Sequence, residues 1–267
     1  MQKVVFFDID GTLVGPSDTI TPSALRTIHA LRANGIKTAI ATGRSGLEMD
    51  WFKERHPVEL FDALIYGNGT QVEIDGKSIT SLYIDPQEVA DIIEVARRHN
   101  IVYGVIDKQR MRMNVERHPL LEYFMDGIFA NAEGLCDPNY HLTHDICAGV
   151  LLTDIHTAER LFEPVLRQCE VVQGIRIGGA TGDHLDFWRK DITKASAIAE
   201  VVGLLGSDMQ HAYAVGDGFN DIQMLEQAGV GIAMGNADPR VQQYADFVTK
   251  RYDEDGIEYA MKHFGLI

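Results

Sequence analysis

Short apolar runs alternate with stretches of helical spacing over the first third of the chain. The run Val4–Phe7 predicts a buried strand, and further buried strands are expected at residues 38–41 and 63–66. Helices are expected between them, from Pro22 to about Gly35 and from Ser45 to Arg55. Strands that alternate with helices in this way form a parallel sheet with right-handed crossovers.

The pattern changes at about Leu82, where strand-like runs follow one another and look paired as hairpins. The elements expected there are a helix at 86–99, strands at 101–106 and 110–114, a helix at 118–130, a strand at 147–152, a helix at 157–167 and short strands within 171–188. Such a segment is typical of an α+β domain inserted into another fold.

After Trp188 the alternation of strand and helix returns. The expected elements are a helix at 195–204, a strand at 212–215, a helix from 222 and a strand at 230–233. We therefore predict an α/β protein with a Rossmann-like parallel sheet core formed by residues 1–81 and 189–267. Residues 82–188 are predicted to form the inserted α+β domain.

The net charge of the chain argues against partners that carry many negative charges. The chain has 267 residues with 24 Lys and Arg against 39 Asp and Glu, a net charge of −15, so binding to nucleic acid or to an anionic membrane surface is not expected. No apolar stretch is long enough to span a membrane. The cysteines are odd in number and form no CxxC pair, which favours a reducing, cytoplasmic location.

Two carboxylates follow the first strand, at Asp8 and Asp10. Residues two apart on a strand share a face, so both side chains can point beyond the carboxyl edge of the sheet, where α/β proteins bind ligands. Gly11 allows a sharp turn there. Two carboxylates this close repel each other unless a cation or a proton intervenes, so a metal site is expected. An ordinary acidic turn is the alternative.

A second acidic strand end lies at Gly216–Asp221. Asp217 can join Asp8 and the backbone carbonyl of Asp10 as oxygen ligands of Mg²⁺, a cation that favours few carboxylates plus water and phosphate. Asn220 and Asp221 stand at the start of the next helix, where they can cap it and orient the site. A plain Asx-rich turn would give the same residues.

Two further segments carry groups that can bind a phosphate. Thr42 and Gly43 end the second strand just before a helix, so a hydroxyl and free N–H groups are available for phosphate oxygens. Lys194 precedes a helix of small residues and can neutralise the charge of Asp8 and of a phosphate. The alternatives are a capping threonine and a solvated lysine.

Together these segments resemble the haloacid dehalogenase (HAD) superfamily. The sequence DIDGT at 8–12 resembles its first motif, Thr42 in ATGR the second, Lys194 the third and GDGFND at 216–221 the fourth. The insertion resembles the type 2 (C2B) cap of the Cof-like sugar-phosphatase branch. The approach to the third motif departs from the family pattern, which leaves Lys190 as an alternative to Lys194.

The resemblance implies a phosphatase in which Asp8 attacks phosphorus and Asp10 is the general acid and base. It implies Mg²⁺ as cofactor. The implied site consists of catalytic Asp8, Asp10 and Lys194; phosphate-binding Ile9, Thr42, Gly43, Lys194 and Asn220; metal-binding Asp8, Asp10 and Asp217; and supporting Gly11, Thr12, Arg44 and Asp221.

The expected partner is a small phosphorylated metabolite such as a sugar phosphate, and the expected assembly is a monomer or a homodimer. Alternatives are a phosphomutase using the same aspartates, a non-catalytic phosphosugar sensor, and a dinucleotide-binding oxidoreductase, which the absence of GxGxxG after the first strand disfavours. The polar residues of the insertion that are candidates for substrate selection are Arg110, Arg112, Asn114, Asp183, His184 and Asp186.

Overall fold

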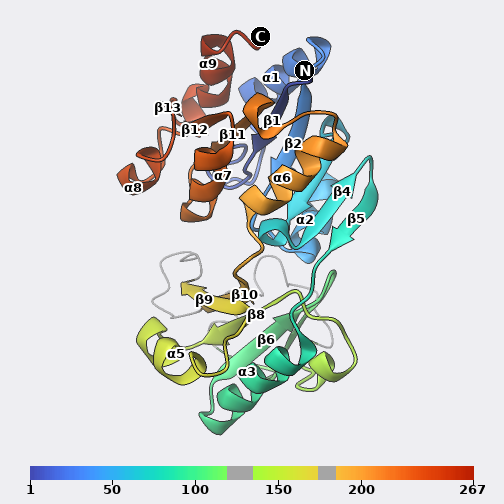
Figure 1. Cartoon of the computed structure of the whole chain (residues 1–267), viewed down its shortest axis with the longest axis vertical. Helices are drawn as coiled ribbons and strands as arrows, with labels where there is room; N and C mark the ends of the chain where they lie inside the picture. The colour runs from blue at the N-terminus through green and yellow to red at the C-terminus, as the bar shows by residue number, and fades with distance from the viewer. Residues whose placement is uncertain (119–134, 174–184) are drawn as a thin grey trace. The chain divides into compact units, whose positions relative to one another are not determined.

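The computed structural model describes residues 1–118, 135–173 and 185–267, which form two compact units (Figure 1). The first unit comprises Met1–Arg44, Phe52–Ser81 and Ile192–Ile267, and the second comprises Ser45–Trp51 and Leu82–Asp191. The predicted helix at 118–130, apart from its first residue, and the candidates Asp183 and His184 lie outside the described residues.

The first unit contains an eight-stranded sheet in the order β13-β12-β11-β1-β2-β3-β4-β5. Its strands are β1 (Val4–Phe7), β2 (Lys37–Ala41), β3 (Ala63–Tyr66), β4 (Gln71–Ile74), β5 (Lys77–Ser81), β11 (Ala212–Gly216), β12 (Val230–Ala233) and β13 (Phe247–Val248). The strands from β13 to β3 pair in parallel, which confirms the predicted parallel core.

The β4–β5 hairpin at the edge of the sheet was not predicted. Its two strands are antiparallel, and the turn between them is Asp75-Gly76, both with positive φ, 49° and 71°. Asp-Gly is the sequence that favours a two-residue hairpin turn with this backbone, so the signal for the hairpin was present.

Helices cover both faces of this sheet because alternate strand residues are buried on each side. Val4 and Phe6 share a core cluster with residues of α6 and α7, while α1 and α9 contact each other and α1 contacts β2. The α-helices within the described residues are α1 (Pro22–Ala33), α2 (Gly46–Arg55), α3 (Pro86–Arg98), α5 (Ile155–Phe162), α6 (Lys194–Leu204), α7 (Ile222–Gln227), α8 (Pro239–Gln242) and α9 (Gly256–His263). Short 3₁₀ helices are η1 (Val58–Leu60), η2 (Gly67–Gly69), η3 (Tyr140–Leu142), η4 (Met209–His211), η5 (Phe219–Asp221) and η6 (Tyr252–Glu254).

In its described residues, the second unit is built on a five-stranded antiparallel sheet in the order β7-β6-β8-β10-β9. Its strands are β6 (Val102–Ile106), β7 (Met111–Met113), β8 (Ala148–Leu152), β9 (Cys169–Gln173) and β10 (Leu185–Arg189). Residues of α3 and α5 pack with the sheet in one core cluster, as expected for an α+β unit. Helix α5 ends at Phe162, five residues before the predicted end.

Parallel strands of the first unit end at the same edge of its sheet. The residues that follow them are Asp8 after β1, Thr42 after β2 and Asp217 after β11. Hydrogen bonds hold these strand ends in register, since Asp8 N–H donates to Val215 O and Thr42 N–H to Ile65 O, both at 2.9 Å. The polar residues predicted from separate segments are therefore brought to one edge. No helix in the described ranges is long and apolar enough to cross a membrane.

Glu88 ties α3 to β9 in the second unit. It is fully buried, and its carboxylate accepts hydrogen bonds from the N–H groups of Arg167, Gln168 and Cys169 at 2.7–3.0 Å. Burial opposes its charge, but these N–H groups outweigh burial, led by that of Cys169, and lower the pKa of Glu88. A lowered pKa means that Glu88 stabilises the fold above the pKa of the unfolded chain.

We predict that Glu88→Gln lowers the free energy of unfolding of the second unit by about 2–4 kcal/mol at pH 7, because a charged acceptor of backbone N–H groups is lost. Urea denaturation followed by tryptophan fluorescence measures this, since Trp51 and Trp188 both belong to that unit. The difference from wild type should shrink as the pH falls through the lowered pKa. Glu94→Gln, on the exposed side of α3, is the control, and an equal loss in both variants would contradict the prediction.

Candidate active site

Asp8 and Lys194 form a buried ion pair. Lys194 is the first residue of α6 and is held there by a capping box in which Thr193 and Ser196 exchange hydrogen bonds. Its Nζ lies 2.6 Å from Asp8 Oδ1, and its side chain is completely buried. Lys190, the alternative lysine, is exposed. The structure therefore brings Lys194, and not Lys190, to Asp8.

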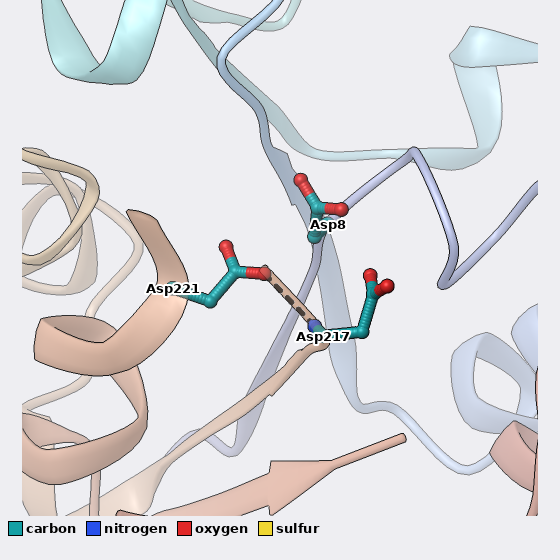
Figure 2. Close-up of side chains that lie close together, drawn as sticks. All are labelled: Asp8, Asp217 and Asp221. Carbon is teal, nitrogen blue, oxygen red and sulfur yellow. Dashed lines mark hydrogen bonds between the residues drawn. The ribbon is translucent and has the colours of Figure 1, made fainter. Parts of the chain in front are cut away.

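Asp221 binds the same ammonium group. Its Oδ1 lies 2.5 Å from Lys194 Nζ, and its Oδ2 accepts the N–H groups of Asp217 and Gly218 at 2.9 and 2.8 Å. Figure 2 shows the bond to Asp217 and the three carboxylates of Asp8, Asp217 and Asp221 around one point. Asp221 thus both pairs with Lys194 and shapes the loop that carries Asp217.

The Asp217 carboxylate is held by the loops that follow β1 and β12. Thr12 Oγ1 donates to its Oδ1, and Asn236 Nδ2 donates to its Oδ2, both at 3.1 Å. Asn236 also donates to Gly11 O at 2.9 Å. Gly11 has a φ of 82°, and a Cβ there would overlap the Asp217 carboxylate, so glycine is needed on both grounds.

The three carboxylates are suited to a divalent cation. Asp8, Asp217 and Asp221 each place one oxygen within 4.8 Å of the others. Burial and then the Asp221 charge raise the pKa of Asp8, and the same two causes raise the pKa of Asp217 to about 7. A cation among them would relieve this repulsion, and carboxylate oxygens are the ligands that Mg²⁺ takes.

Lys194 stays charged in this surrounding. Burial by itself would lower the pKa of its ammonium group, but Asp221 and Asp8 outweigh burial and raise that pKa. The positive charge lies beside the Asp8 carboxylate, so it is available to a negative group that approaches Asp8.

Asp10 is not part of the three-carboxylate cluster, and its carboxylate binds Arg44. Its two oxygens accept from Arg44 Nε at 2.9 Å and from Arg44 Nη2 at 2.7 Å, and its side chain is 53% exposed. Strand β1 ends at Phe7, and the chain turns at Gly11. Asp10 therefore lies beyond the strand, and the alternation of strand faces does not apply to it. It is still close enough to Asp8 for its charge to contribute to the raised pKa of Asp8.

The predicted phosphate-binding residues lie around the end of β2. Thr42 is buried and its Oγ1 accepts the Arg44 N–H at 3.2 Å. A Cβ on Gly43 would lie 3.1 Å from Asn68 Oδ1 and 3.2 Å from Asn220 Nδ2, and Asn220 donates to Asn68 at 3.0 Å.

Asn68 and Ile9 complete the surroundings of these residues. Asn68 stands in η2 with a φ of 54°, and its N–H donates to Thr42 O at 3.0 Å. Ile9 is buried between the two aspartates, and its carbonyl accepts the N–H groups of Thr12 and Val14. Its backbone thereby helps to hold the turn that follows Asp8.

Asn236 was missed in the sequence. It follows β12 in Met234-Gly235-Asn236, so its signal was the same as that of Asp217, namely a polar residue and a glycine after a buried parallel strand. The polar residues Asp18 and His56 were missed too. They precede and follow the first two helices, where no strand-end pattern marks them.

Comparison with known proteins places the whole chain in one family. The model of the haloacid dehalogenase-like hydrolases matches residues 5–261. The Bacillus subtilis (strain 168) protein named "Putative phosphatase YkrA" is 31% identical over 276 residues, which covers 100% of this chain and 99% of that protein. The Escherichia coli (strain K12) protein named pyridoxal phosphate phosphatase YbhA is 28% identical over 276 residues, with 96% of each chain covered.

Solved structures agree with this. BT4131, a sugar phosphatase of HAD subclass IIB, superposes with a TM-score of 0.84 at 28% identity, and the match covers 100% of both chains. Both units of this chain therefore have counterparts in that protein, the inserted one included.

We predict that Lys194→Met lowers the free energy of unfolding by about 3–5 kcal/mol at pH 8, because Asp8 and Asp221 are left buried without their cation. Unpaired buried carboxylates have raised pKa values, so the fold without the lysine is favoured when they are protonated. The deficit should therefore shrink at pH 5. Urea denaturation at both pH values measures it, with Lys190→Met as the control, and a deficit that grows toward low pH would contradict the prediction.

Proposed function

We propose that this chain, which belongs to the haloacid dehalogenase-like hydrolases and is a phosphatase, hydrolyses phosphate monoesters of small metabolites through an aspartyl-phosphate on Asp8. The observation that carries the proposal is the buried Asp8 carboxylate, bonded at 2.6 Å to a buried lysine. A carboxylate next to a fixed positive charge can meet a phosphate dianion that it would otherwise repel.

The reaction has two balanced steps. In the first, an Asp8 oxygen forms a bond to phosphorus, the bond from phosphorus to the substrate's ester oxygen breaks, and Asp10 gives its proton to that oxygen. In the second, water attacks the phosphorus, Asp10 takes a proton from the water, and the bond from phosphorus to Asp8 breaks. Free phosphate leaves and both aspartates return to their starting states.

The residues around the end of β2 are proposed to bind the phosphate. The Thr42 hydroxyl, the Asn220 amide and the backbone N–H groups of Ile9 and Gly43 are the donors, and Lys194 supplies charge. Thr42 is placed by its hydrogen bond with the Arg44 N–H, and Asn220 by Asn68. Donors held in advance stabilise the charge that spreads over the phosphate oxygens during transfer.

Mg²⁺ is the proposed cofactor. Asp8, Asp217 and the backbone carbonyl of Asp10 would hold it, with Asp221 adjacent, and the crowding of carboxylates that raises the pKa of Asp217 supports a cation there. When bound, the ion supplies positive charge that neutralises phosphate oxygens.

Relatives with small phosphorylated substrates in their names support the proposed substrate class. BT4131 is a sugar phosphatase, and YbhA is named a pyridoxal phosphate phosphatase. We propose that residues 82–188 act as the substrate-selecting cap and residues 1–81 and 189–267 as the catalytic core. A cytoplasmic location is also proposed, supported by the three free cysteines. A monomer or homodimer remains the predicted assembly.

We predict that Asp8→Asn lowers phosphate release on the order of 10³-fold or more, because the amide cannot form the covalent intermediate. Release of inorganic phosphate would be measured over a panel of sugar phosphates, pyridoxal phosphate and flavin mononucleotide, with Mg²⁺ and with a chelator. The chelator should abolish release and added Mg²⁺ should restore it.

The possible outcomes separate the competing functions. Release that survives Asp8→Asn would overturn the proposed nucleophile. Conversion of a sugar phosphate to its isomer without phosphate release would identify a phosphomutase. Binding without any turnover by the folded wild-type protein would identify a sensor.

Mg²⁺ binding can be measured without activity. At tenfold above its dissociation constant, a ligand of the native state stabilises by about 1.4 kcal/mol, so Mg²⁺ should raise the melting temperature by roughly 3–6 °C. We expect Asp217→Asn to lose this rise. Asp253→Asn, in the surface acidic cluster 253–255, should keep it, and a rise that persists in Asp217→Asn would place the ion elsewhere.

A further inference from the structure

Arg44 lies between two carboxylates in the first unit. It donates to both oxygens of Asp10, and its Nη2 also donates to Asp18 Oδ1 at 2.5 Å. The Arg44 side chain is 13% exposed, and its guanidinium carbon lies 5.2 Å from the centre of the Phe52 ring. An arginine side chain that binds two carboxylates and lies over an aromatic ring has little conformational freedom. The position of the Asp10 carboxylate therefore depends on the groups that hold Arg44.

The Asp18 carboxylate also lies close to His56. Its Oδ2 is buried and has no hydrogen-bond partner among the described residues, and neither does the buried Nε2 of His56. These two atoms lie 3.8 Å apart, and the centres of the His56 and Phe52 rings lie 4.2 Å apart with the ring planes tilted by 36°. Burying a carboxylate oxygen without a hydrogen bond costs free energy, and the hydrogen bond from Arg44 to the other oxygen offsets part of this cost.

The backbone places Asp18 for this bond. Its φ is 48°, in the left-handed region that residues other than glycine rarely adopt. The loop closes on itself, since Asp18 N–H donates to Gly15 O at 2.9 Å and Val14 forms a bridge with Ile20. Val14 also forms a bridge with Asp10. One closed loop thus carries both carboxylates that bind Arg44.

We propose that Asp18 is a positioning residue that acts through Arg44 to set the orientation of Asp10 for proton transfer. This inference rests on the proposed function, in which Asp10 gives its proton to the ester oxygen while the bond from that oxygen to phosphorus breaks. Asp10 is half exposed and would otherwise sample several orientations, whereas a general acid must lie within hydrogen-bond reach of the leaving oxygen.

The consequence depends on the leaving group. An alkyl phosphate such as a sugar phosphate expels a strongly basic alkoxide unless that oxygen is protonated. p-Nitrophenyl phosphate expels a weakly basic phenolate that needs no proton. Loss of correct acid placement therefore slows the first substrate much more than the second. Loss of the fold, of the metal or of phosphate binding slows both alike.

The test is kcat/KM for both substrates in Asp18→Ala, since kcat/KM reports the first phosphoryl transfer and is unaffected by slow hydrolysis of the intermediate. We expect a loss of about 10-fold or more for the sugar phosphate, within the 10²–10⁴-fold that general acids contribute. The loss for p-nitrophenyl phosphate should stay below about threefold. Asp18→Asn keeps an oxygen for Arg44 and should recover most of the lost rate.

Three further variants make the result decisive. Asp10→Ala should show the same dependence on leaving group with a larger loss. Glu258→Ala removes a surface ion pair with Arg26 and should leave both rates unchanged. Asp8→Asn should abolish turnover of both substrates, which tests the proposed function by itself.

An equal loss on both substrates in Asp18→Ala, or no loss on either, would overturn the inference while leaving the proposed function standing. If kcat/KM in Asp10→Ala fell equally for both substrates, Asp10 would not be the general acid, and the inference would fall with that role. Melting temperatures of all variants would identify any loss that comes from unfolding.

Discussion

The fully buried ammonium group of Lys194 is the charge on which the site depends. It pairs with Asp8 and Asp221 at once. Asp8 directly follows β1, and Asp221 lies in η5, which follows the neighbouring strand β11. A buried charge is tolerated only when it is paired, so the lysine, both aspartates and the start of α6 must be in place together. The fold and the proposed nucleophile therefore share one set of interactions.

Arg44 pairs with two carboxylates at the more exposed side of the site, as Lys194 does at the buried side. Five carboxylates, those of Asp8, Asp10, Asp18, Asp217 and Asp221, face two cations there, Arg44 and Lys194. This leaves an excess of negative charge when all are ionised. This excess negative charge repels an anionic phosphate group. A divalent cation bound among the carboxylates would offset the repulsion, so the proposed metal and the proposed phosphate binding depend on each other.

The sequence predicted the location of polar residues correctly where they directly follow a buried strand. Asp8, Thr42 and Asp217 were predicted to lie together because parallel strands end at one edge of a sheet, and the structure has them there. The same reasoning would have found Asn236, and Asp75-Gly76 would have given the edge hairpin. It did not find Asp18 or His56, whose contacts with Arg44 and Phe52 arise from loop closure between residues that no short pattern connects.

The sequence by itself determined the central parallel strands, the inserted α+β unit and the family, because periodicity and short motifs are local properties. Only the tertiary structure decided that Lys194 rather than Lys190 meets Asp8, that Asp221 shares this lysine, and that the Asp10 carboxylate turns to Arg44. These choices depend on distances between segments far apart in the chain. Burial and charge pairing decide which residues meet, and both depend on the folded arrangement of the chain.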